Sequence, residues 1–229
     1  MRVLVVAVHP DDETLGCGGT LLKHKANGDE IYWIIVTTIK DGYRGWDLGF
    51  SEEVIEKREK EIKKVANMYN FDGVFRLKFP TMRLDEISMS ELIDAVSKVF
   101  KKVKPNIVYL PFKSDVHSDH RKVFEASFSC VKTFRYPFIK KVLMMETISE
   151  TDFAPATKED AFVSNVFVDI SDVFEKKLEI MKIYESELGT HPFPRSIETI
   201  EALAKVRGAQ AGCKYAESFM LLKEIIRWI

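Results

Sequence analysis

Two short clusters of metal-binding side chains stand far apart in this chain. The first is His9-Pro-Asp-Asp-Glu13 and the second is Asp115-Val-His-Ser-Asp-His120. Two imidazoles and one carboxylate can hold a divalent cation such as zinc and still leave one coordination position open. A cation in an open site polarises a carbonyl and makes water more acidic, and a free carboxylate nearby can act as general base. The clusters therefore predict a metal-dependent hydrolase.

The spacing within each cluster suggests separate tasks for its members. His9 and Asp12 lie three positions apart across a bend and can share a cation, while Asp11 stays uncoordinated at the edge of the site. His117 and His120 have the same spacing, so at the start of a helix one can coordinate and the other can face the open side. Taken singly, the acidic residues would also suit a helix N-terminus, and the second cluster could be a helix cap with incidental histidines.

Both clusters follow stretches that read as buried strands, which would place them at one edge of a sheet. Residues 3–8 are a continuous apolar run before His9, and residues 107–110 precede the second cluster. Open α/β sheets place their ligand crevices at the carboxyl ends of strands. We therefore expect the two clusters to converge on one cation.

The rest of the chain alternates between strand and helix patterns. Further strands are predicted at residues 31–37, 74–78, 142–147 and 162–170. Helices are predicted at 14–26, after Ser51 to 69, from Ser88 or Ser90 to the proline at 105, after Ser118 or Asp119, at 171–184 and after Ser196. The apolar stretch from residue 215 is expected to pack onto the sheet. This alternation predicts a doubly wound α/β fold, with a mostly parallel central sheet between two helical layers.

Composition limits the remaining possibilities. The chain has 229 residues, 46% of them hydrophobic, which suits one substantial core and a single domain over residues 1–229. A formal net charge of −1 gives no basic excess for nucleic acid or an anionic membrane. No apolar run could span a membrane, and the N-terminus is too short for a complete signal peptide. The odd, widely spaced Cys17, Cys130 and Cys213 favour free thiols in a cytoplasmic protein.

The two clusters also carry a family resemblance. The stretch Ala7-Val-His-Pro-Asp-Asp-Glu-Thr-Leu-Gly-Cys-Gly-Gly19 resembles the signature of the LmbE-like, or PIG-L, family of zinc-dependent N-deacetylases. The cluster at 115–120 is similar to that family's second metal motif. Three weaker likenesses support these: an Arg-x-x-Glu at Arg58, the stretch His191-Pro-Phe-Pro-Arg-Ser196 with two inserted residues, and residues 207–219. The resemblance thus spans nearly the whole chain.

The resemblance implies a Rossmann-like fold and removal of an N-acetyl group from an N-acetylglucosamine-type sugar or sugar conjugate. It implies one Zn²⁺ per chain held by His9, Asp12 and His120. A site with two histidines and an aspartate would also take iron(II) or another divalent ion. Relatives of this kind commonly assemble, so a homo-oligomer is a further possibility.

The positions of the motifs also imply roles for other residues. Asp11 would be the general base, and His117 would stabilise the oxyanion or help to protonate the departing amine. Asp119 would hold His117 in the required tautomer. Arg58 would contact substrate hydroxyls or an acidic substituent, with a solvated helix residue as the alternative. His191 could reach the site or only stiffen a turn.

Other features suggest weaker expectations. The stretch Gly16-Cys-Gly-Gly19 matches neither a dinucleotide fingerprint nor a phosphate-binding loop, so close helix–sheet packing is expected there. His24 is expected to be an exposed helix residue. Tyr43, Trp46 and Phe50, on the loop after the second strand, could stack on a sugar or pack against the loop or another subunit.

Two other functions fit the same clusters. A metallophosphoesterase would bind a pair of ions rather than one. A non-catalytic ligand-binding module would be expected to lack Asp11 or His117, and this chain retains both.

Overall fold

The computed structural model describes residues 1–39 and 50–227. Its strands are β1 (Arg2–Ala7), β2 (Glu30–Thr38), β3 (Gly73–Pro80), β4 (Ile107–Leu110), β5 (Lys141–Met145), β6 (Val166–Asp169) and β7 (Ala216–Glu224). Its helices are α1 (Asp12–Ala26), α2 (Glu52–Tyr69), α3 (Met89–Val103), α4 (Ser118–Phe128), α5 (Phe174–Met181) and α6 (Ile197–Ala211). Short 3₁₀ turns are η1 (Leu84–Glu86), η2 (Ser129–Val131) and η3 (Glu185–Glu187). None of the helices in these ranges combines the length and the apolar character that crossing a bilayer requires.

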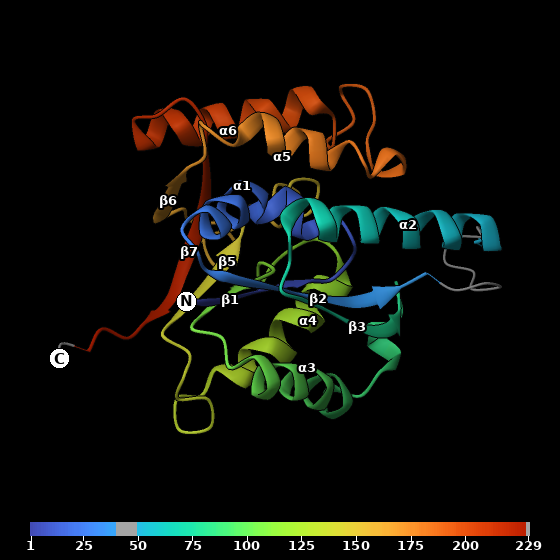
Figure 1. Cartoon of the computed structure of the whole chain (residues 1–229), viewed down its shortest axis with the longest axis vertical. Helices are drawn as coiled ribbons and strands as arrows, with labels where there is room; N and C mark the ends of the chain where they lie inside the picture. The colour runs from blue at the N-terminus through green and yellow to red at the C-terminus, as the bar shows by residue number, and fades with distance from the viewer. Residues whose placement is uncertain (40–49, 228–229) are drawn as a thin grey trace.

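The strands form one seven-stranded sheet in the order β3-β2-β1-β4-β5-β7-β6. Strands β3, β2, β1, β4 and β5 are parallel, and β7 runs antiparallel to both β5 and β6. Helices α3 and α4 cover one face, while α1, α2, α5 and α6 lie on the other (Figure 1). The predicted three-layer α/β fold with a mostly parallel sheet is confirmed.

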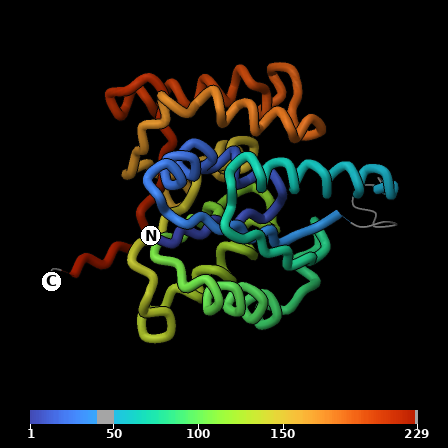
Figure 2. Tube along the Cα trace, viewed as in Figure 1, coloured from blue at the N-terminus to red at the C-terminus, as the bar shows by residue number. Residues whose placement is uncertain are grey.

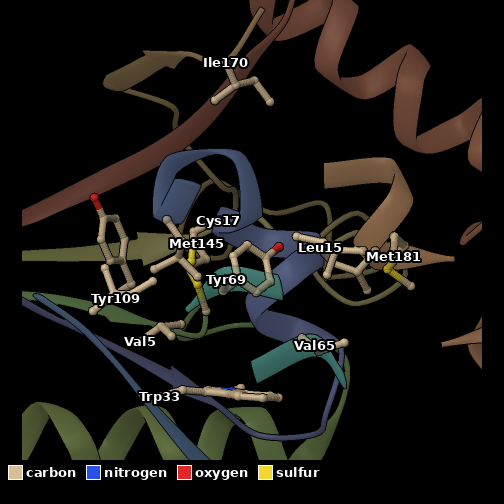
Figure 3. Packing of buried hydrophobic residues seen from close by; sticks show 14 of the residues in the cluster. Val5, Leu15, Cys17, Trp33, Val65, Tyr69, Tyr109, Met145, Ile170 and Met181 are labelled. Carbon is tan, nitrogen blue, oxygen red and sulfur yellow. The ribbon is translucent and has the colours of Figure 1, made fainter. Parts of the chain in front are cut away.

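The core consists of two apolar clusters, one on each face of the sheet. Successive side chains of a strand point to opposite faces, so β1 contributes Val3 and Val5 to one cluster and Leu4 and Val6 to the other. A strand covered on both faces must be apolar throughout, which explains the unbroken run at residues 3–8. Figure 3 shows the α1 side, where Trp33 of β2 lies beneath residues of α1 and α2.

Serine side chains set the starts of three helices. Ser51 accepts a hydrogen bond from the backbone N–H of Val54, and Ser88 and Ser196 make the same contact three residues ahead at α3 and α6. Such caps satisfy backbone donors that have no partner within the first helical turn. The predicted starts of these helices are confirmed, with Ser88 rather than Ser90 as the cap of α3.

The glycine stretch in α1 permits close packing, as predicted. Built Cβ atoms would lie 2.9 Å from Met145 Cβ at Gly16 and 2.7 Å from Ile170 Cγ2 at Gly19. Helix α1 is also broken at Cys17, where φ is −150° and ψ is 22°. Cys17 itself is fully buried. Glycine therefore lets the broken helix lie against β5 and the end of β6.

A buried ion pair satisfies the backbone groups that the break in α1 releases. The Glu217 carboxylate, from β7, accepts the N–H groups of Gly19 and Thr20 at 2.8 and 2.7 Å. The Lys177 ammonium, from α5, donates to the Leu15 carbonyl at 3.0 Å and to Glu217 at 2.7 Å. Both side chains are only 5% exposed. Two distant elements thus join the halves of α1, whose first residues lie at the candidate site.

Some expected elements differ in the structure. The C-terminal stretch joins the sheet as β7, between β5 and β6, instead of packing onto it. The strand and helix expected at 162–170 and 171–184 shorten to β6 and α5. His24 is not an exposed residue: Nδ1 lies 2.7 Å from Asp29 Oδ2 and Nε2 lies 2.9 Å from Tyr109 Oη. The pairing of β7 and the contact of His24 with Tyr109 join distant parts of the chain, which local pattern does not encode.

Candidate metal centre and active site

The predicted metal ligands converge in the structure. His9 Nδ1 lies 3.3 Å from His120 Nε2, and Asp12 Oδ2 lies 3.5 Å from His120 Nε2 and 3.9 Å from His9 Nδ1. Donor atoms about 2.0–2.1 Å from a tetrahedral cation are roughly 3.3 Å apart. The three side chains therefore fit one divalent cation, and their donor set of two imidazoles and one carboxylate is that of an open site.

Sheet topology brings these residues together. Strands β1 and β4 are adjacent and parallel, although much of the chain separates them (Figure 2). The chain turns to β2 on one side of β1 and later returns to β4 on the other side, which makes a topological switch point. His9 follows the carboxyl end of β1, and His120 stands in the first turn of α4, after β4.

A hydrogen-bonded carboxylate orients His120. Its Nδ1 lies 2.8 Å from Asp115 Oδ2, and Thr151 donates to Asp115 Oδ1 at 2.7 Å. A carboxylate that accepts the Nδ1–H leaves the Nε2 lone pair free to bind a cation. Asp115 belongs to the predicted cluster, but its position in the sequence indicated no role for it. Only the fold reveals that its carboxylate reaches back to the ring of His120.

Asp12 and Asp11 are adjacent in sequence but differ in their contacts. Asp12 Oδ2 accepts the backbone N–H groups of Val8 and His9 at 2.9 and 2.8 Å, which fixes its direction. Among the residues that the structure describes, no hydrogen bond reaches the Asp11 carboxylate, although Asp11 occupies the cap position of α1. Its φ of 142° is costly for a residue with a Cβ atom. Such strain commonly marks a functional position.

Charge and burial shape the environment of Asp11. Burial, together with the carboxylates of Asp12 and Glu187, raises the pKa of Asp11 well above its ordinary value. The backbone N–H of Asp11 donates to Glu13 Oε2 at 3.1 Å. Glu13 is fully buried and also accepts the Tyr184 hydroxyl at 3.0 Å, and burial raises its pKa to about 7. Glu13 thus holds the strained Asp11 backbone by a hydrogen bond, a role that the sequence pattern did not predict.

His117 caps α4 through Nδ1, which leaves its Nε2 free for another contact. Its Nδ1 accepts the backbone N–H of Asp119 at 3.1 Å, so the neutral ring carries its proton on Nε2. Burial and the imidazoles of His9 and His120 lower the pKa of His117 to about 4. The His117 and His9 rings are 4.6 Å apart between centroids. His117 therefore stands beside the metal ligands as a neutral donor.

Asp119 contacts His117 through its backbone N–H and not through its carboxylate. The carboxylate accepts the backbone N–H groups of Met82 and Leu84 at 2.6 and 3.2 Å, and lies 3.7 Å from His9 Nε2. The N–H of Asp119, not its carboxylate, fixes the tautomer of His117. The carboxylate points to the loop after β3 because backbone donors there need partners once the strand has ended.

The donor cluster opens into a cavity of about 440 Å³. His9, Asp11, Asp12, Arg58 and His117 are the predicted site residues that line it. Phe50 also lines it, while Tyr43 and Trp46 lie outside the described residues. His120 is fully buried beneath the cavity. A cavity of this size at strand ends is typical of a small-molecule site.

Arg58 lies on the cavity wall and is not a solvated helix residue. Its side chain is 14% exposed. It donates to the Pro10 carbonyl at 3.3 Å, to the Ser186 hydroxyl at 3.1 Å and to the Glu187 carboxylate. The alternative of a residue on the solvated face of α2 is therefore excluded.

His191 does not reach the cavity. It is exposed, and its Nδ1 lies 3.4 Å from Thr199 Oγ1. Arg195, four positions later in the same motif, lines the cavity and donates to the Glu187 carbonyl at 3.0 Å and the Ser149 hydroxyl at 2.9 Å. The predicted stretch thus reaches the site through its arginine, just before the cap of α6.

A second group of potential metal donors shares a residue with the first. His9, His117 and Asp119 offer donor atoms within 4.8 Å of one another. His9 belongs to both groups, so the second group lacks a ligand set of its own. Within residues 1–39 and 50–227, the arrangement therefore gives no independent second site that would favour a two-ion phosphoesterase.

Deacetylases are among the known proteins that this chain resembles. The diacetylchitobiose deacetylase of Thermococcus kodakarensis is 26% identical over 232 residues, which cover 98% of this chain and 84% of that protein. The solved N,N'-diacetylchitobiose deacetylase of Pyrococcus horikoshii shares the fold with a TM-score of 0.74 at 21% identity, over 97% of this chain and 84% of that one. The GalB hydratase of Pseudomonas putida gives 0.73 at 17% identity, over 100% and 98% of the two chains, so this fold also carries other chemistry.

The family model described as "PIG-L: GlcNAc-PI de-N-acetylase" matches residues 4–131. This match extends over more than half of the chain and includes both donor clusters. The chain belongs to the PIG-L family.

Proposed function

We propose that this protein is a metal-dependent N-deacetylase that removes the acetyl group from an N-acetylglucosamine-type sugar or sugar conjugate. The observation that carries the proposal is the convergence of His9, Asp12 and His120 beside an Asp11 carboxylate that no described hydrogen bond engages. Family membership and the likeness to a diacetylchitobiose deacetylase support the choice of an acetylated amino sugar.

His9, Asp12 and His120 would hold one Zn²⁺ or a similar divalent cation. Their donor atoms are spaced for one tetrahedral cation. His9 would bind the cation through Nδ1, and its Nε2 is buried without a hydrogen-bond partner among the described residues. When bound, the cation supplies a Lewis acid that polarises the acyl oxygen and eases deprotonation of water. Asp115 is proposed to keep the ring of His120 in its orientation.

Asp11 would transfer a proton during the reaction, and His117 would donate a hydrogen bond. Asp11 takes a proton from the attacking water and delivers it to the amine as the C–N bond breaks. His117 donates its Nε2–H to the acyl oxygen, where negative charge develops. This assignment follows from the hydrogen bond at Nδ1, which leaves Nε2–H as the donor of the neutral ring. Arg58 and Arg195 form the wall against which the sugar would bind.

A direct assay tests the proposal. Metal-loaded protein would be incubated with N,N'-diacetylchitobiose and other N-acetylglucosamine conjugates, and free amine and acetate would be measured with and without chelator. We expect both products in equal amounts, and only with metal present. A fully metal-loaded protein that releases neither product from any N-acetyl sugar would contradict the proposal.

A further inference from the structure

We infer that the cavity selects uncharged N-acetyl sugars, and that Glu187 sets this selectivity by neutralising the arginines of the cavity wall. The inference rests on the proposed deacetylase site and specifies its substrate class. A neutral and an anionic sugar conjugate would differ most in how they interact with the charges of the cavity wall.

One carboxylate bridges two guanidinium groups on the wall. Glu187 Oε1 accepts a hydrogen bond from Arg58 Nη2, and Glu187 Oε2 accepts one from Arg195 Nη2 at 3.3 Å. The side chains of Glu187, Arg58 and Arg195 are 24%, 14% and 22% exposed. In such a partly buried place, ion pairing strongly lowers the attraction that either arginine could offer to a substrate anion.

The remaining arginine of the wall is also paired. Arg76 lines the cavity and donates to both oxygens of Glu59 at 2.8 Å, in a two-pronged contact. Carboxylates and phosphates prefer this same two-pronged geometry, so Glu59 occupies the face that an anion would use. Among the described residues, no lysine lines the cavity. The described wall thus has no cation left unpaired for an acidic substituent.

Carboxylates face the same space. Glu150, Glu187 and, in the native protein, Asp11 line the cavity, and Glu150 Oε1 lies 3.9 Å from Arg195 Nη1. An anionic substituent would meet these charges where solvent screens them poorly, whereas sugar hydroxyls could bind to Ser149 and Ser186 without that cost. Discrimination against one ligand class commonly uses such repulsion.

The variant Glu187→Gln tests the role of this charge. It removes one negative charge and leaves Arg58 and Arg195 with a neutral partner of the same size. Unpaired guanidinium groups bind carboxylates and phosphates well. The variant is therefore expected to bind anionic sugars more tightly than the native cavity does.

The experiment compares two ligands that differ in one charge, N-acetylglucosaminyl glycerol and N-acetylglucosaminyl glycerate. Binding is measured by calorimetry with the metal-loaded full chain carrying Asp11→Asn, so that turnover does not interfere. We expect the neutral sugar to bind about tenfold more tightly, which corresponds to ~1.4 kcal/mol, and Glu187→Gln to remove most of this preference.

Glu185→Gln is the matched control. Glu185 lies on the same 3₁₀ turn, is 74% exposed and pairs with Lys57 Nζ at 3.2 Å, outside this cavity. The inference is overturned if the neutral sugar fails to bind, if the acidic sugar binds equally well or better, or if Glu185→Gln shifts the preference as much as Glu187→Gln. Absence of turnover by the native protein, with the preference intact, would instead contradict the proposed reaction.

Discussion

At the residue scale, the contrast between Asp11 and Asp12 explains how adjacent carboxylates can take different tasks. Backbone N–H groups hold the Asp12 oxygen toward the two imidazoles. The Asp11 carboxylate lines the cavity and accepts no hydrogen bond from the described residues. Sequence spacing predicted this division, because a tight bend cannot direct all of its side chains to one point. It did not predict the positive φ of Asp11 or the support from Glu13, which depend on the packed structure.

Two substitutions separate metal binding from proton transfer. Asp11→Asn should keep the metal and lower kcat by about 10²–10⁴, the usual contribution of a general base. His9→Ala should lose the metal, because it removes a ligand. Metal content by mass spectrometry and kcat on the same samples check both. Equal loss of metal in the two variants would contradict the roles assigned to them.

Asp115 contacts the proposed ligand His120 without being a ligand itself, so its substitution tests the effect of ring orientation. Asp115→Ala keeps every proposed ligand but frees the His120 ring, so we expect metal affinity to fall about 10–100-fold. Competition with a chelator of known affinity measures this. Asp172→Ala is the control, since Asp172 forms a surface pair with Lys23 far from the ligands in sequence and is 65% exposed. An affinity that changes no more in Asp115→Ala than in the control would exclude the orienting role.

At the element scale, the starts and ends of most helices and strands follow from local signals. Ser51, Ser88 and Ser196 cap their helices as the sequence indicated, and continuous apolar runs marked the buried strands. The break of α1 at Cys17 could not be predicted this way. Its stabilising partners, Glu217 and Lys177, come from elements much later in the chain.

The ion pair at the break predicts a large effect on stability. Lys177→Met leaves the Glu217 carboxylate buried without its cation, which should cost about 3–5 kcal/mol of unfolding free energy. Lys176→Met is the matched control, because Lys176 pairs with Glu179 at the surface. Urea denaturation of both variants measures the difference. Equal stability of the two would show that the Lys177 contact contributes little.

At the scale of the whole molecule, the site depends on the order of the strands. Because β1 and β4 are neighbours, the predicted clusters meet, and this much of the site was predictable from the positions of buried strands. The opposite wall was not: Glu187 and Arg195 come from segments between α5 and α6 that carry no strong local signal. In that region the motif predicts His191 instead of Arg195, because a motif likeness identifies a segment more readily than the side chain that enters the cavity.

The arrangement of the layers also predicts how the chain unfolds. One sheet carries both apolar clusters, so we propose that residues 1–229 form a single domain. Thermal unfolding of metal-free protein should then show one cooperative transition, with the same midpoint by circular dichroism and tryptophan fluorescence. Two separate midpoints would contradict a single domain.

The central claim is that one cation binds where the two clusters meet, and anomalous diffraction from crystals of zinc-loaded protein tests it most directly. We predict one ion per chain, about 2.0–2.2 Å from donor atoms of His9, Asp12 and His120, with its remaining position open to the cavity. An ion bound elsewhere, or a pair of ions at the site, would contradict the account.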